Sequence, residues 1–255
     1  EFSYSVYQPA ILGSTSRNRF LILYMLEIIY EDDVLIAINK PHGLFVHRTK
    51  LDKESTEFAI QLLRDMIGQR VYPAHRLDRK TAGVLLFTKD QASQSLMNVM
   101  FRNKEVHKTY LAIVRGYTDD AGTIDYPLIS EKGTEQDAIT HYKTLSRGEI
   151  PVSSGKFPTS RYSLVEVNPE TGRMHQIRRH MSHIFHPIIA DRPHGCNKQN
   201  RFFLQQFEMD TMMLHASEVR FIHPISGKAL HIQANIHDEF TRMLQTLNLF
   251  TLKQV

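Results

Sequence analysis

Cysteine and tryptophan are almost absent from this sequence: its 255 residues include one cysteine and no tryptophan. The lone Cys196 excludes an intrachain disulfide and a cysteine-based zinc site, and it is typical of a protein from a reducing cytoplasm. No apolar run approaches the roughly 20 residues of a membrane-spanning helix. P-loop and G-x-G-x-x-G motifs, internal repeats and low-complexity tracts are also missing. We therefore expect a cytoplasmic globular protein.

The domain organisation is simple, because no composition shift divides residues 25–255, which we expect to form one domain. Residues 1–24 have the look of a tag or leader, and Met25 is the expected natural start. Strand-like segments outnumber helix-like ones and do not alternate with them. This pattern predicts an α+β fold, a mixed and mainly antiparallel sheet flanked by helices and loops.

Four elements of that fold are indicated most clearly. A run of Val, Leu, Leu and Phe at 84–87 predicts a buried strand, and residues 108–116 predict a central strand because both of its faces are apolar. A helix is expected from about 55 to 67, closed by Gly68, and a second after Asp90, which can cap it.

The first candidate site residue is Asp78, which stands between Arg76 and Arg79 just before the strand at 84–87. Nearby guanidinium groups favour the ionised form of a carboxyl group, which suits a nucleophilic or electrostatic role. An ordinary surface ion pair is the alternative, and from spacing alone it is the commoner outcome.

A second informative segment is the helix expected at 172–185. At about 100° per residue, its apolar stripe places Arg178 at the buried edge and Arg179 on the opposite side. A guanidinium that faces a core needs a carboxylate, because an unpaired buried charge is very costly. We expect Asp78 to be that carboxylate. The stripe comprises Met174, Ile177, Met181, Ile184 and Phe185.

Histidines cluster in and after this helix, at His175, His180, His183 and His186. An H-E-x-x-H motif is missing and no carboxylate lies within the helix, so we expect a polar helix face and no metal site.

Basic residues are in mild excess, with a formal net charge of +4 and a sequence pI near 9.1. They cluster in three places: around the Asp78 segment, on the strand that carries Tyr110, and on the Arg178 helix. Such a cluster is expected for a surface that binds a nucleic-acid backbone. A solvated surface is the alternative for such charges, and a core position is the alternative for Tyr110. The cluster comprises Arg76, Arg79, Lys80, Lys108, Arg161, Arg173, Arg178 and Arg179.

Three segments together are similar to a known family. His-Arg-Leu-Asp at 75–78, Lys-x-Tyr-x-Ala-x-Val-x-Gly at 108–116 and Gly-Arg-Met-His-Gln-Ile-Arg-x-His at 172–180 resemble, in order, the three signature segments of the RluA-type pseudouridine synthases. The resemblance extends from residue 25 to the C-terminus. It implies the catalytic fold of that family, an isomerase activity on RNA, and no cofactor or metal.

The resemblance also implies residue roles. Asp78 would be the nucleophile, attacking the ribose C1′ or the uracil C6. Tyr110 would pack on the target base and assist deprotonation at C5, Arg178 would hold Asp78 by a charge-assisted pair, and Arg76 would enter the RNA stack as the uridine leaves it. The residues expected to contact RNA are His75, Arg76, Arg79, Lys108, Arg173, His175 and Gln176.

Within the family, the start at 25–30 and the stretch from 157–162 through 186–189 are most similar to the synthases that act on uridine 65 of tRNA. An enzyme for ribosomal RNA is the alternative inside the family, and a catalytically idle RNA-binding module is the alternative outside it. The joint presence of Asp78, Tyr110 and Arg178 argues against idleness, since a pure binder has no use for a nucleophile.

Three residues depart from the family pattern: Lys80 stands where Pro is usual, Ala82 where Ser is usual, and Ala190 where Gly is usual. None of them removes a chemical group from the implied mechanism. The N-terminal S4 domain that is frequent in the family is not expected here, so the catalytic domain itself would hold the RNA. We expect a monomer that needs no protein partner.

Overall fold

The computed structural model describes residues 26–48 and 57–249. The expectations about residues 1–24 and about positions 55–56 of the helix at 55–67 lie outside these residues. That helix begins at Ala59, later than expected, because Phe58 is extended and forms a β-bridge with Phe45. The described helices are α2 (Ala59–Ile67), α3 (Gln91–Arg102), α4 (Gln176–His183), α5 (Asn197–Phe207) and α6 (Asp238–Thr246). The strands are β1 (Glu27–Glu31), β2 (Leu35–Lys40), β3 (Tyr72–Pro73), β4 (Ala82–Thr88), β5 (His107–Arg115), β6 (Ala121–Asp125), β7 (Leu128–Ile129), β8 (Glu135–Gln136), β9 (Ile139–Ile150), β10 (Ser160–Pro169), β11 (Leu214–Ile222) and β12 (Ala229–Gln233).

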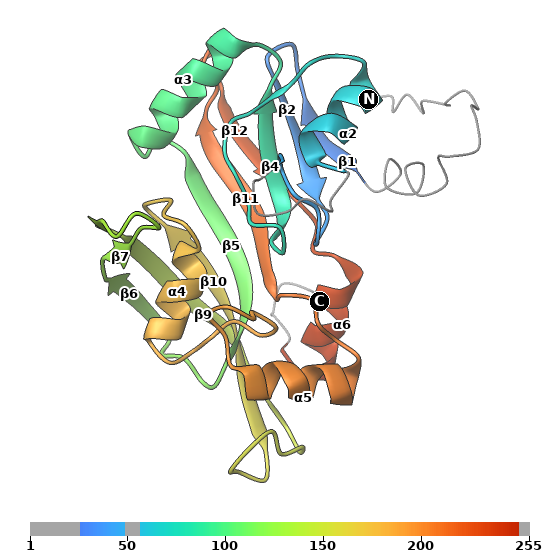
Figure 1. Cartoon of the computed structure of the whole chain (residues 1–255), viewed down its shortest axis with the longest axis vertical. Coiled ribbons are helices and arrows are strands. Elements are labelled where there is room, and N and C mark those ends of the chain that lie inside the picture. Colours follow the sequence, from blue (N-terminus) through green and yellow to red (C-terminus); the bar gives the residue numbers. More distant parts are fainter. Residues whose placement is uncertain (1–25, 49–56, 250–255) are drawn as a thin grey trace, which may run out of the picture.

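One large sheet organises the described part of the chain (Figure 1). Its strands follow the order β1-β2-β4-β11-β5-β10-β9-β6, with β12 added beside β11 and β3 beside β4. The pairings along this sheet are antiparallel except for the short parallel contact between β4 and β11. The predicted mixed, mainly antiparallel α+β architecture is therefore confirmed.

Both faces of the sheet are covered at β4, which explains why this strand is almost entirely apolar. Every residue of β4 is buried. Leu85 and Phe87 pack into the larger core, to which α2, α5 and α6 contribute, whereas Val84 and Leu86 pack into the second core with α3. Successive side chains of a strand point to opposite faces, so a strand buried on both sides reads as a continuous apolar run.

Two of the predicted helix ends are also confirmed. The side chain of Asp90 accepts a hydrogen bond of 2.8 Å from the Ser93 amide at the start of α3. Gly68 ends α2 in the left-handed conformation, with φ 65°, which glycine adopts without steric cost.

The third predicted helix is shorter than the sequence pattern indicated. It covers Gln176–His183 and not 172–185, because His175 and Phe185 on either side have left-handed backbones, with φ 54° and 65°. Consequently Met174 and Phe185 leave the buried stripe, and their exposed fractions are 44% and 88%. Their expected place in the core was wrong.

Three central strands meet in one row that lies next to the Asp78 segment. Gly83 of β4 pairs with Ala216 of β11, and Ala216 pairs with Tyr110 of β5. This register ties the beginning of β4, five residues after Asp78, to the strand that carries Tyr110. The sheet therefore fixes the distance between two of the predicted site residues.

We expect Gly83→Ala to destabilise the protein strongly. A Cβ at Gly83 would lie 2.1 Å from the backbone oxygen of Ala216, and φ at Gly83 is +106°. Backbone overlap and a disfavoured φ together should lower the free energy of unfolding by about 2–5 kcal/mol. Thermal or urea unfolding measures the change. Gly133→Ala is the matched control for the backbone term, because φ there is +79° and a Cβ would meet nothing within 4 Å; equal losses in the two variants would contradict the steric argument.

Candidate active site

Asp78 lies in a tight turn that the neighbouring loop holds in place. Thr81 donates a backbone hydrogen bond of 3.0 Å to the Asp78 carbonyl, which closes the turn. Arg79 exchanges bonds with the loop at Gly43, because its carbonyl accepts from the Gly43 amide at 2.9 Å and its Nε donates to the Gly43 carbonyl at 3.0 Å. The Asp78 side chain retains 29% exposure, so the carboxylate is fixed but remains open to a substrate.

Arg178 of α4 binds this carboxylate directly. Its Nη1 donates to Asp78 Oδ2 at 2.7 Å, and its own side chain is only 7% exposed. The predicted pair of Arg178 with Asp78 is therefore confirmed. A charge-assisted bond to a guanidinium fixed in the protein orients the carboxylate and leaves its second oxygen for other chemistry.

Asp191 is a site residue that the sequence analysis missed. It accepts two bonds from Arg178, from Nε at 2.8 Å and from Nη2 at 2.7 Å, and its side chain is 1% exposed. Arg178 thus bridges two carboxylates that lie 113 residues apart in sequence. The sequence analysis could have anticipated a second acid, because a buried guanidinium has five N–H donors and Asp78 alone cannot accept from all of them.

The charge state of this cluster follows from its contacts. Burial lowers the pKa of Arg178, but its hydrogen bonds to Asp191 and the negative charges of Asp78 and Asp191 outweigh burial, and the net shift of the pKa is upward. Arg178 is therefore a permanent cation between two carboxylates.

Tyr110 lies on β5, close enough to Asp78 for that charge to affect it. Burial, and then the negative charge of Asp78, raise the pKa of the Tyr110 phenol well above its usual range. The phenol is consequently neutral at ordinary pH, and 9% of the residue is exposed. It can offer a ring face and a hydroxyl to a substrate, but not a resident phenolate.

Lys40 is a second residue that the sequence analysis missed, at the end of β2. It is fully buried, and its Nζ donates to the carbonyls of Pro41 and Leu44 at 2.9 Å and to that of Arg79 at 3.1 Å. Burial lowers its pKa to about 7, against the opposing charge of Asp78. Lys40 therefore connects the loop at 41–44 by hydrogen bonds to Arg79, the residue that follows Asp78. The available signal was a lysine at the end of the strand, shortly after its apolar residues 35–38.

His175 lies beside the catalytic candidate as well. Its Nε2 is 3.8 Å from Asp78 Oδ1, and its Nδ1 is 2.9 Å from Nε2 of His194. Burial lowers the pKa of both imidazoles. His175 also carries the left-handed backbone that precedes α4, a conformation that costs energy outside glycine and is common at functional sites.

The remaining predicted RNA contacts fall into two groups. Arg76 and Arg79 are exposed beside Asp78, and the Arg79 guanidinium lies 4.8 Å from the centre of the Phe45 ring. Lys108 and Arg173 are partly exposed near the loop that precedes α4. Burial lowers the pKa of Lys108 to about 8. These four are the cationic side chains among the predicted RNA contacts, and each remains at least partly exposed.

His75 and Gln176 have structural roles that the sequence analysis did not anticipate. Nε2 of His75 accepts the Leu86 amide at 3.1 Å, and burial lowers the pKa of His75 to about 4, so the ring is neutral. Gln176 is 4% exposed, and its amide bonds Thr171, the Arg173 amide, Ile139 and Thr140 at 2.7–2.9 Å. Every hydrogen-bonding position of the Gln176 amide is used inside the protein, so its expected RNA contact is not supported.

Two histidines after Gln176, His180 and His183, also make contacts within the protein. His180 is buried and lies 2.9 Å from both Thr140 Oγ1 and the Tyr126 carbonyl, and His183 stacks on the Tyr126 ring at 3.7 Å. In the part of the chain that the structure describes, no group of three His, Cys, Asp or Glu residues is placed to hold a metal ion.

One departure from the family pattern has a visible consequence. Ala190, where glycine is usual in the family, has φ 59° and immediately precedes Asp191. The chain turns there so that Ala190 donates to Asn200 at 3.0 Å and the Asp191 carbonyl accepts from the same amide at 2.7 Å. The left-handed backbone thus helps to aim Asp191 at Arg178.

Comparisons with known proteins identify the family to which the chain is similar. Residues 34–183 match the family model of the RNA pseudouridylate synthases. A tRNA pseudouridine synthase C from Vibrio cholerae serotype O1 is 48% identical over 231 residues, covering 86% of this chain and 95% of that protein. The protein of the same name from Pasteurella multocida is 47% identical over 236 residues, covering 88% and 96%.

Solved structures support the fold. Human RNA pseudouridylate synthase domain containing 4 superposes with a TM-score of 0.71 at 24% identity, covering 89% of this chain and 96% of the other. Its human counterpart, domain containing 1, gives a TM-score of 0.66 at 21% identity, covering 95% and 99%. The sequence matches extend over the Asp78, Tyr110 and Arg178 segments, and the chain therefore belongs to the RNA pseudouridylate synthase family.

Proposed function

We propose that this protein converts uridine 65 of tRNA to pseudouridine, with Asp78 as the nucleophile. The observation that carries the proposal is the Asp78 carboxylate, partly open to solvent and held at 2.7 Å by the buried Arg178. A carboxylate kept in one orientation by a fixed cation is suited to covalent attack, since orientation removes much of the entropic cost.

The reaction is an isomerisation that balances within the substrate. The bond from ribose C1′ to uracil N1 breaks, the uracil rotates, and a bond from C1′ to C5 forms. The hydrogen at C5 leaves as a proton and N1 gains a proton, so no oxidant, reductant or water is consumed. We accordingly expect no cofactor or metal requirement. The carboxylate of Asp78 can attack C1′ or C6, and both routes use the same residue.

Tyr110 and Arg76 would handle the target base. The neutral Tyr110 ring can stack on the uracil, and we expect its hydroxyl to assist removal of the C5 proton, since the charge of Asp78 acts on this phenol. The exposed Arg76 is suited to occupy the space that the uridine leaves in the RNA stack. Extrusion of a base costs a few kcal/mol, which such a contact partly offsets.

The tRNA substrate rests on the relatives named tRNA pseudouridine synthase C, which match nearly their whole length. An enzyme of the same family for ribosomal RNA, or an RNA-binding protein without turnover, is the competing hypothesis. The catalytic group and its buried cation favour an enzyme over a pure binder, because a buried charge is maintained at a cost.

Nucleotide-resolution mapping of pseudouridine tests the substrate. The purified protein is incubated with unmodified tRNA and with ribosomal RNA fragments, and each RNA is mapped afterwards. We expect nearly complete conversion at position 65 of tRNA, and none in ribosomal RNA. Conversion confined to ribosomal RNA would refute the tRNA assignment, and binding without conversion in any RNA would refute the enzymatic one.

A further inference from the structure

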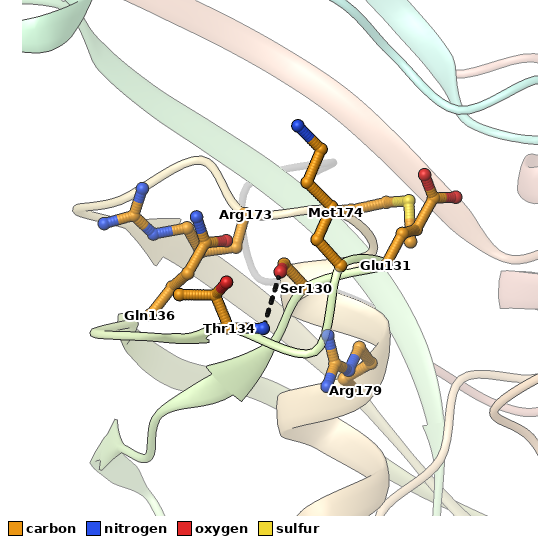
Figure 2. Close-up of a pocket in the computed structure, with 8 residues that line it drawn as sticks. Ser130, Glu131, Thr134, Gln136, Arg173, Met174 and Arg179 are labelled. Atoms are coloured by element: carbon orange, nitrogen blue, oxygen red, sulfur yellow. Dashed lines mark hydrogen bonds between the residues drawn. The ribbon is translucent and has the colours of Figure 1, made fainter.

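We propose that a pocket beside α4 binds a nucleotide of the RNA strand adjoining the target uridine. The pocket lies between the β7–β8 turn and the Arg173–Met174 segment, and has a volume of about 410 Å³ (Figure 2). This inference rests on the proposed function, and it assigns RNA binding to the short β7–β8 hairpin, which carries none of the predicted site residues.

The hairpin side of the pocket is an ordered turn. Ser130 exchanges backbone bonds of 2.8 and 3.0 Å with Thr134 and Gly133, and its hydroxyl accepts the Thr134 amide at 3.1 Å. Leu128, at the start of β7, is only 2% exposed and anchors the hairpin in the protein. The side chains of the turn are therefore presented from a fixed support.

Two arginines attach the hairpin to the α4 region. Arg179 Nη1 donates to the Ile129 carbonyl at 3.0 Å, and Arg173 Nε donates to the Asp137 carbonyl at 2.9 Å. Each guanidinium has five N–H donors and uses one in these bonds. Both side chains also line the pocket, so their other donors can bind phosphate oxygens there.

The lining has the chemistry of a nucleotide site. Lys132, Arg173 and Arg179 supply three positive charges against the one carboxylate of Glu131. Met174 adds an apolar side chain that is 44% exposed, and it can cover a base or ribose while the cations bind the phosphate. The volume falls within the range of about 300–1,000 Å³ that is usual for small-ligand sites.

The position explains why the nucleotide would adjoin the target. Met174 on the pocket wall is followed directly by His175, whose Nε2 lies 3.8 Å from Asp78 Oδ1. Consecutive Cα atoms are about 3.8 Å apart, so His175 is the one residue that separates Met174 on the pocket wall from its contact with the proposed nucleophile. A strand that places its uridine at Asp78 therefore runs past this pocket.

Two variants test the proposal without disturbing the contacts of the hairpin. Lys132→Gln removes a charge from the exposed turn, and Met174→Ala removes an exposed apolar side chain. Lys228→Gln and Ile225→Ala are matched controls in the exposed β11–β12 turn, and the strands β11 and β12 that it joins lie apart from the β7–β8 hairpin (Figure 1). The readouts are the Kd for unmodified tRNA over a salt series, and kcat and KM for pseudouridine formation.

We expect Lys132→Gln to raise the Kd about 3- to 10-fold at low salt and to reduce the slope of log Kd against log salt by about 0.7–0.9, the value of one phosphate contact. Met174→Ala should raise the Kd by a similar factor without changing the salt slope. In both variants the fall in kcat/KM should arise from KM, and the two controls should match the wild type.

If Lys132→Gln and Met174→Ala bind tRNA as their controls do, while the wild type converts uridine, the pocket proposal is wrong and the proposed function stands. If the wild type forms no pseudouridine in any RNA, the proposed function fails, whereas a reduced salt slope in Lys132→Gln would still support an RNA contact at the pocket.

Discussion

Asp78→Asn should abolish pseudouridine formation and leave tRNA binding intact. Asparagine preserves the size of the side chain but is no nucleophile, so we expect turnover to fall by at least about 10³-fold. The variant also removes a negative charge from a site for a polyanion, so its Kd for tRNA should be equal to or lower than that of the wild type. Nucleoside analysis after incubation with tRNA, and a parallel binding assay, measure the two effects.

The matched control for this experiment is Asp33→Asn. Asp33 is exposed in the β1–β2 turn, and the substitution makes the same change of charge away from Arg178. We expect it to retain wild-type turnover. Substantial turnover by Asp78→Asn, or an equal loss in the two variants, would contradict the role of Asp78.

Asp191→Asn should produce the second large effect, on both stability and turnover. The amide can accept only on one side, and its NH₂ group would face an N–H of Arg178 that now donates to a carboxylate at 2.7–2.8 Å. Because both side chains are buried, we expect the free energy of unfolding to fall by about 3–5 kcal/mol. A displaced Arg178 should lower kcat about 10- to 100-fold, while the Kd for tRNA stays within about twofold.

Glu239→Gln provides the comparison for the stability effect. Glu239 also accepts two bonds from one arginine, Arg242, at 2.6–2.7 Å, but this pair on α6 is exposed to solvent. Such surface pairs contribute at most about 1 kcal/mol. Equal melting temperatures for Asp191→Asn and Glu239→Gln, with unchanged kcat, would show that Asp191 does not position Arg178.

Those parts of the fold that depend on local sequence were predictable. The apolar run of β4 indicated a strand buried on both faces, Asp90 indicated a helix start, and Gly68 indicated a helix end. The pair of Arg178 with Asp78 was also predictable, because an inward guanidinium requires an acid and few acids adjoin an apolar strand. These predictions depend on periodicity and on the cost of a buried charge.

The remaining features of the fold and the site depend on tertiary contacts, which the periodicity of the sequence does not reveal. Residues Met174 and Phe185 fit the apolar stripe by spacing, yet left-handed backbones next to them end the helix, and the core never reaches them. Gln176 is polar, but it is buried because four partners surround it. Asp191 directly follows Ala190, which the family pattern already marked, but neither that pattern nor the spacing indicates that Asp191 or Lys40 lies next to Asp78 and its loop; only the folded chain brings them there.

Release of tritium from tRNA that carries 5-tritiated uridine tests the central claim most directly, because the new bond to C1′ displaces the hydrogen at C5. With a chelator present and no added cofactor, we predict about one equivalent of tritium per tRNA from the wild type and none above background from Asp78→Asn. Tritium release by Asp78→Asn at the wild-type rate would contradict the account.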